Sequence, residues 1–133
     1  MAIITYPLNN ITYDAAAAEL YFCTRSSGVF AVKDNLDCSI SGDREITISP
    51  GIAWIRNDRF SGKVAGLLEA ETLLIDAAEQ TLPRIDRVVL RFDAAANATG
   101  LFIKKGTPAS SPAASARETG AGLYELVLYD LYI

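Results

Sequence analysis

The stretch PRIDRVVLRFD, from Pro83 to Asp93, decides the fold class of this chain. It places two aspartates and three arginines in an otherwise apolar run that begins with a proline. Successive side chains of a β-strand point to opposite faces. The run therefore divides into two sets: Ile85, Arg87, Val89, Arg91 and Asp93 on one face, and Asp86, Val88, Leu90 and Phe92 on the other. Asp86 and Asp93 point in opposite directions and cannot form a catalytic pair within this strand.

The charged residues of this stretch allow three interpretations. The sequence favours an amphipathic strand that exposes Arg87 and Arg91 to water and carries an Arg84–Asp86 ion pair at its start. In the second interpretation, the two arginines of the charged face pair with a partner subunit. A catalytic cluster is the interpretation that the alternation favours least.

The segments after this strand continue the β pattern. Residues 94–100 link it to LFIKKG, residues 101–106, which we expect to be its hairpin partner. Residues 107–122, TPASSPAASARETGAG, have the composition of a loop. The last run, LYELVLYDLYI, alternates Tyr124, Leu126, Leu128 and Tyr132 with Val127, Tyr129, Leu131 and Ile133. Because both of its faces are apolar, this strand is buried on two sides or lies in an interface. The expected subunit-interface residues are Arg87, Arg91, Tyr129, Leu131 and Ile133.

The segments before the strand predict one helix and several short strands. Asp14 is a suitable N-cap for a helix over about residues 14–25, which Ser26-Ser27-Gly28 would end. Strand patterns follow at residues 28–32, 36–41 and 44–49, and another at 71–78. Residues 50–66 read as a hairpin in which Asn57-Asp58 form a tight turn. We therefore expect a mainly β protein, a single antiparallel β-sandwich or barrel-like domain over residues 1–133, with one short N-terminal helix.

The composition argues against several classes of function. The net charge is −4 and the basic residues are scattered, which disfavours a nucleic-acid-binding surface. The sequence has no histidine, so it lacks the commonest general base, and it contains no nucleotide-binding or hydrolase motif. The two cysteines, Cys23 and Cys38, are expected to be buried thiols, with a disulfide as the alternative, and a metal site is disfavoured. We expect no catalytic residue, no cofactor and no metal.

The apolar runs and the N-terminus bear on localisation. No uncharged apolar run approaches the roughly 20 residues that span a bilayer, so we expect no membrane insertion. The N-terminus MAIITYPLNN has neither a basic start nor an apolar core of the signal-peptide type.

Trp54, the single tryptophan, is the one aromatic residue with a specific alternative to core packing. Core packing is the default expectation. A platform for stacking sugars, or an oligomer contact, is the alternative.

Several stretches taken in order resemble a known family. They are YPLNNITYDAAAAELYFCTRSSGVFA, ITISPGIAWIRNDRFSG, LPRIDRVVLRFD, GTPASSPA and YELVLYDLYI. Together they resemble the N-terminal domain of tail or baseplate proteins from phages and prophages of Gram-positive bacteria. The resemblance covers nearly the whole chain, and the PRID strand with the GTPASSP loop is its most specific part.

The resemblance implies a structural, non-catalytic role. It implies a virion tail location after assembly in the host cytoplasm, and a homo-oligomer, a trimer or hexamer, that contacts other tail or baseplate proteins. Proteins of the family continue into fibre or receptor-binding modules, and the apolar end of this chain leads us to expect a piece of a longer protein. The alternative function is a carbohydrate-binding module for host cell-surface glycans, with Trp54 as its platform.

Overall fold

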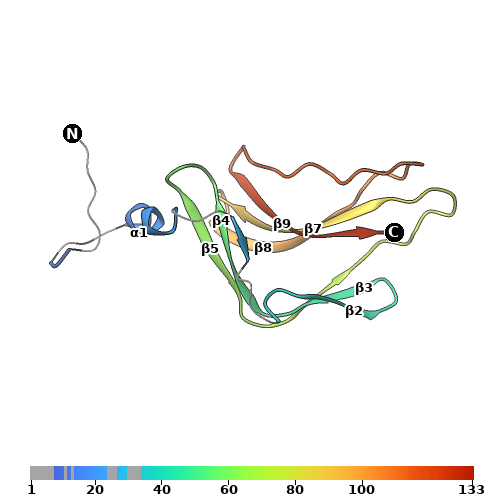
Figure 1. Cartoon of the computed structure of the whole chain (residues 1–133), viewed down its shortest axis with the longest axis horizontal. Helices are drawn as coiled ribbons and strands as arrows, with labels where there is room; N and C mark the ends of the chain where they lie inside the picture. Colours follow the sequence, from blue (N-terminus) through green and yellow to red (C-terminus); the bar gives the residue numbers. More distant parts are fainter. Residues whose placement is uncertain (1–7, 11, 13, 24–26, 30–33) are drawn as a thin grey trace.

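The computed structural model of the chain describes residues 8–10, 12, 14–23, 27–29 and 34–133, and it is mainly β (Figure 1). The elements are α1 Ala15–Phe22, β1 Gly28–Val29, β2 Cys38–Gly42, β3 Glu45–Ile48, β4 Gly51–Arg56, β5 Gly62–Leu67, β6 Glu71–Leu74, β7 Ile85–Asp93, β8 Ala98–Lys104 and β9 Leu123–Tyr132. The expected fold class, a β-sandwich-like domain with one short helix, is confirmed.

The strands form three antiparallel sheets of three strands each. Sheet A has the order β1-β4-β5, sheet B the order β2-β3-β6, and sheet C the order β8-β7-β9. In Figure 1, β4, β5 and the β2–β3 hairpin lie along one side of sheet C, and the chain between β8 and β9 passes along its other side. The core lies between these layers, and its buried members come from all three sheets and the approach to β2: Leu36, Ile46, Ile48, Ala53, Ile55, Ala65, Val88, Leu90, Phe92 and Leu101.

Helix α1 is shorter than the expected span of residues 14–25. Asp14 has an extended backbone, and its carboxylate accepts a hydrogen bond from the Ala17 amide at 3.4 Å, as an N-cap does. The helix ends at Phe22, and Cys23 caps it by donating its amide to the Glu19 carbonyl. The expected stop at Ser26 and the strand positions 30–32 lie outside the described residues.

The connection between β4 and β5 differs from the expected two-residue turn. The loop has five residues, and the amide of Asn57 donates to the Ser61 carbonyl. The Asp58 carboxylate accepts hydrogen bonds from the amides of Phe60 and Ser61, and these bonds lower the pKa of Asp58. The prediction that Asn57-Asp58 form a tight turn was wrong, because the Asp58 side chain organises a wider loop.

Strand β7 is the centre of sheet C and follows the alternation predicted for PRIDRVVLRFD. Asp86, Val88, Leu90 and Phe92 are buried on the core side, and the residues of the other face are mostly half-buried. The expected hairpin with residues 101–106 is confirmed, since β8 pairs with β7 from Arg87–Lys104 to Asp93–Ala98.

Strand β9 contains a β-bulge that the sequence pattern did not predict. Val88 of β7 faces Tyr129, whereas the next residue, Val89, faces Val127. Leu128 is therefore the extra residue of the bulge. As a result Val127 lies on the arginine side of the sheet and Tyr129 on the core side, whereas strict alternation had placed both on one face.

Candidate functional site

The two arginines of the β7 face are paired within the chain. Arg87 donates to both carboxylate oxygens of Asp130 on β9, at 2.7 and 3.0 Å. Arg91 donates to the Glu125 carboxylate, also on β9, at 2.6 Å. The hydrogen bond with Arg87 lowers the pKa of Asp130 and raises that of Arg87. The expectation of a free arginine face in water was wrong, because both guanidinium groups have an acidic partner directly across the sheet.

Residues 115–118 lie over part of this face and are attached to it by hydrogen bonds. Arg87 donates to the Ser115 carbonyl at 3.0 Å. Lys104 donates to the Ala116 carbonyl, and the Glu118 amide donates to the Glu125 carboxylate at 2.8 Å. The loop composition of the segment was predicted correctly, but the loop lies on the sheet rather than projecting into solvent.

Glu125 is the centre of this attachment. It is 1% exposed, and its carboxylate accepts hydrogen bonds from Arg91, Lys104 and the Glu118 amide. Burial by itself would raise the pKa of Glu125, but these three hydrogen bonds outweigh it, so the pKa lies below the ordinary value. Glu125 was not among the expected functional residues. Its only signal in the sequence was an acidic residue inside the apolar run of β9.

The Arg84–Asp86 ion pair predicted from the sequence is confirmed, and it is fully buried. The two residues are 2% and 1% exposed, and their side chains form two hydrogen bonds of 2.9 and 3.1 Å. Arg84 also donates to the carbonyls of Asp76 and Ala77, and Asp86 accepts the amide of Gly106 at 2.9 Å. The pair therefore ties the chain before β7 to the chain after β8, which is a structural role.

The five expected interface residues do not form one surface. Arg87 and Arg91 lie on the face to which residues 115–118 are attached, as described above. Tyr129 and Leu131 lie on the opposite face and pack against the core, and the Tyr129 hydroxyl donates to the Leu36 carbonyl at 2.9 Å. Ile133 pairs with Arg84 through two backbone hydrogen bonds at the end of the sheet. An interface that uses all five residues together would have to contact both faces of sheet C.

Trp54 lies beneath helix α1 and is 7% exposed. The ring of Phe22 in α1 lies 5.6 Å from the Trp54 ring, and Glu19 of the same helix forms an ion pair with Lys63 on β5. In the part of the chain that the structure describes, the Trp54 ring nitrogen has no hydrogen-bond partner. The expectation of core packing is confirmed. The sugar platform is not formed at Trp54, because the helix covers the ring.

The remaining candidate groups show no metal or redox site within the described residues. No cluster of three or more histidine, cysteine, aspartate or glutamate side chains is placed there to hold a metal ion. Cys23 is buried, Cys38 is partly buried, and neither forms a disulfide. Burial raises the pKa of both thiols, which disfavours their reactive thiolate forms. Among the described residues, no helix is long and apolar enough to cross a membrane.

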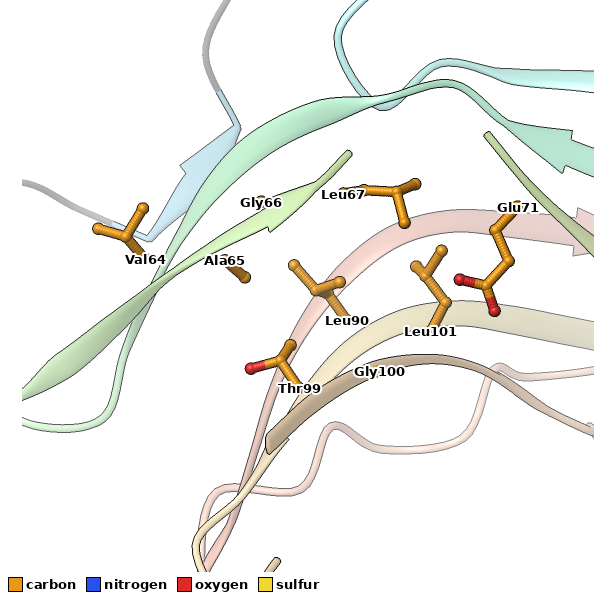
Figure 2. A pocket seen from close by; sticks show the side chains of 9 residues that line it. All are labelled: Val64, Ala65, Gly66, Leu67, Glu71, Leu90, Thr99, Gly100 and Leu101. Carbon is orange, nitrogen blue, oxygen red and sulfur yellow. The ribbon is translucent and has the colours of Figure 1, made fainter. Parts of the chain in front are cut away.

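A groove of about 270 Å³ lies where sheets A and C separate, between β5 and β8. In Figure 2 the side chains of Leu90 and Leu101 point from sheet C toward β5, and Glu71 lies at one end. The lining is otherwise small or apolar: Val64, Ala65, Gly66, Leu67, Thr99 and Gly100. Both strands at the rim are the outermost strands of their sheets, so their outer edges have no strand partner in the described part of the chain.

The other outer strands within the described residues are short, carry a bulge or are attached to a loop. Strand β1 has two residues and β6 has four. Strand β2 carries a bulge between Ile40 and Gly42, although Ile40 is 87% exposed. At β9 the Glu125 amide donates to the Glu118 carbonyl. Short length, bulges and covering loops are recognised means of protecting a sheet edge. The open edge between β5 and β8 is therefore the candidate functional site of the described structure.

Comparison with known proteins finds no relative of this chain. No family model, no curated protein and no solved structure matches the chain.

Proposed function

We propose that this chain is a structural assembly module of a phage or prophage tail or baseplate, without catalytic activity. The observation that supports the proposal most directly is the unprotected edge of β5 and β8, beside large exposed apolar side chains. Leu68, directly after β5, is 88% exposed, and Val64 on β5 is 50% exposed. Apolar surface of this kind beside a free sheet edge is typical of a surface that another chain covers.

The charged residues are consistent with a structural role. Arg84, Arg87 and Arg91 bind acidic side chains of the same chain, and each of these ion pairs fixes a loop or a neighbouring strand. The charges of these three arginines are therefore accounted for by ion pairs that stabilise the fold. In this proposal the residues that a partner would meet first are those of β5 and β8, and the expected interface residues Arg87, Arg91, Tyr129, Leu131 and Ile133 stay untested.

The proposal is tested by the mass of the purified chain in solution, measured by light scattering coupled to size exclusion. A homo-oligomer whose mass is constant over a hundredfold range of concentration is the expected result. A monomer at every concentration would contradict self-assembly of this chain.

One observation favours the alternative, a glycan-binding module, at a position other than Trp54. Phe102 on β8 is 44% exposed and lines a depression of about 200 Å³ together with Arg91 and Asp93. The Arg91 guanidinium lies 4.5 Å from the centre of the Phe102 ring. An exposed aromatic ring with polar groups beside it is the usual arrangement for stacking a sugar ring.

The alternative is tested by sedimentation with insoluble cell walls of a Gram-positive bacterium. Binding that the Phe102→Ala variant loses, and that an exposed control variant such as Ala95→Ser keeps, would support it. Equal sedimentation of the wild type and Phe102→Ala would contradict a site at Phe102.

A further inference from the structure

We propose that β5 pairs antiparallel with β5 of a second copy of this chain about a twofold axis. Sheet A of each copy has three strands, and the pairing would join the two sheets into one continuous sheet. The inference rests on the proposed assembly function and names the surface that performs it.

The backbone of β5 is suited to pairing with another strand. It is the outer strand of sheet A, it spans six residues, and its sequence GKVAGL contains one charged residue and no proline. Gly66 is open on its outer side: a Cβ added there would find only the Leu68 Cδ2 atom, at 3.9 Å. The outer face at Gly66 therefore has room for a side chain from a paired strand.

The side chains of β5 are self-complementary when two copies meet at Ala65. In that register Val64 of one copy lies opposite Gly66 of the second copy, and the reverse holds across the axis. The exposed valine side chain thus meets the position that has no side chain. The two Ala65 residues face each other, so the middle of the junction contains only small groups.

The charges at the two ends of the groove favour the same antiparallel arrangement. Lys63 lies at the beginning of β5, and Glu71 lines the groove beside Leu67 at the other end. A twofold axis exchanges the ends, so Lys63 of each copy approaches Glu71 of the other. Within its own chain Lys63 forms an ion pair with Glu19 and lies 5.5 Å from the centre of the Phe92 ring. The proposed contact would therefore give the partly exposed Lys63 ammonium group a second carboxylate partner, Glu71 of the other copy.

The pairing also explains apolar exposure next to β5. Val64 and Ile52 are 50% and 44% exposed, and Ile52 lies opposite Gly66 in sheet A. Leu68, immediately after the strand, is 88% exposed. In the continuous sheet Val64 of one copy lies across Gly66 from Ile52 of the other copy, so contact between these two side chains would bury part of their exposed surface and stabilise the dimer.

The first test is the mass of the Gly66→Lys variant by light scattering coupled to size exclusion. The wild type should show an even number of copies, at least twice the chain mass of 14.3 kDa. Because position 66 has room for a side chain, the variant should keep its circular dichroism spectrum and melting temperature. Each added lysine would lie opposite Val64 of the other copy, and the two charges would be diagonal neighbours across the axis, so the dissociation constant should rise about 100-fold. The matched control is Ser39→Lys, an exposed position on the edge strand β2, which should assemble as the wild type does.

The second test is a disulfide between copies in the Val64→Cys/Gly66→Cys variant, with diamide as the oxidant. The proposed register places each cysteine opposite its counterpart, so a covalent dimer should form, whereas Val64→Cys alone should give none. A wild-type trimer, or an oligomer that Gly66→Lys leaves intact, would overturn β5 pairing while the assembly function stands. A wild-type monomer would overturn both, and so the two failures are distinguishable.

Discussion

Removal of the Asp86 carboxylate tests whether the charges of PRIDRVVLRFD serve the fold. In Asp86→Ala the Arg84 guanidinium, 2% exposed, keeps two carbonyl partners but loses its carboxylate, and the Gly106 amide loses its acceptor. Breaking a buried ion pair by removing one partner costs about 3–5 kcal/mol. Because the whole domain is stable by about 5–15 kcal/mol, the melting temperature should fall by roughly 10 °C or more.

The assay is chemical unfolding followed by circular dichroism, arranged as a double-mutant cycle. The variants are Arg84→Met, Asp86→Asn and the two combined, since asparagine retains an acceptor for the Gly106 amide. The combined variant should lose less free energy of unfolding than the sum of the single variants, by about 2 kcal/mol, because no charge is left buried alone. The control is Arg87→Met, whose partner Asp130 is 45% exposed, and it should cost at most about 1 kcal/mol.

Additive effects in this cycle, or a loss below about 1 kcal/mol in Asp86→Ala, would refute the reasoning. Either result would mean that the pair is not the tie between the chain segments that its hydrogen bonds indicate, and that its charges are free for another role.

Three further predictions follow from the same structure. The pKa of Glu125 is lower in the folded chain than its ordinary value of 4.5, so its contribution to stability is complete above that pH and is lost as the pH falls through the folded-state pKa. Unfolding midpoints measured between pH 7 and pH 3 should therefore fall less steeply in Glu125→Gln than in the wild type, and parallel curves would contradict this. Phe22→Ala should shift Trp54 emission to longer wavelength and increase its quenching by acrylamide, because Phe22 covers the indole; an unchanged spectrum would mean that α1 does not shield it. Gly106→Ala should lower the free energy of unfolding by about 3 kcal/mol, since the new Cβ would lie 2.0 Å from the Ile85 carbonyl oxygen, and a variant with wild-type stability would contradict that contact.

The division of β7 into two faces and the Arg84–Asp86 ion pair could be predicted from the sequence, whereas the burial of that pair could not. The period of two is a property of any extended backbone, so the positions of Val88 and Leu90 toward the core followed from their spacing alone. The spacing of Arg84 and Asp86 likewise placed two opposite charges on one side of the strand. Asp14 predicted the start of α1, because N-capping depends only on a side chain and the next amides.

The predictions that failed depended on contacts between distant parts of the chain. The bulge at Leu128 is a feature of the pairing between β7 and β9, and it separates Tyr129 from the arginine face. Nothing in the local pattern of LYELVLYDLYI encodes that insertion. Strict alternation therefore assigned Val127 and Tyr129 to one face, whereas the bulge places them on opposite faces.

The sequence by itself determined a mainly β chain, its capped helix and the division of PRIDRVVLRFD into an apolar and a charged face, because these depend on neighbouring residues. Only the tertiary structure decided what those faces meet. It placed the loop of residues 105–122 against the arginine face, where Glu125 accepts hydrogen bonds from Arg91, Lys104 and the loop, and it placed α1 over Trp54. It also left β5 and β8 open at the edge of the sandwich. Strand pairing and layer packing join residues far apart in sequence, and such contacts are fixed by the fold as a whole.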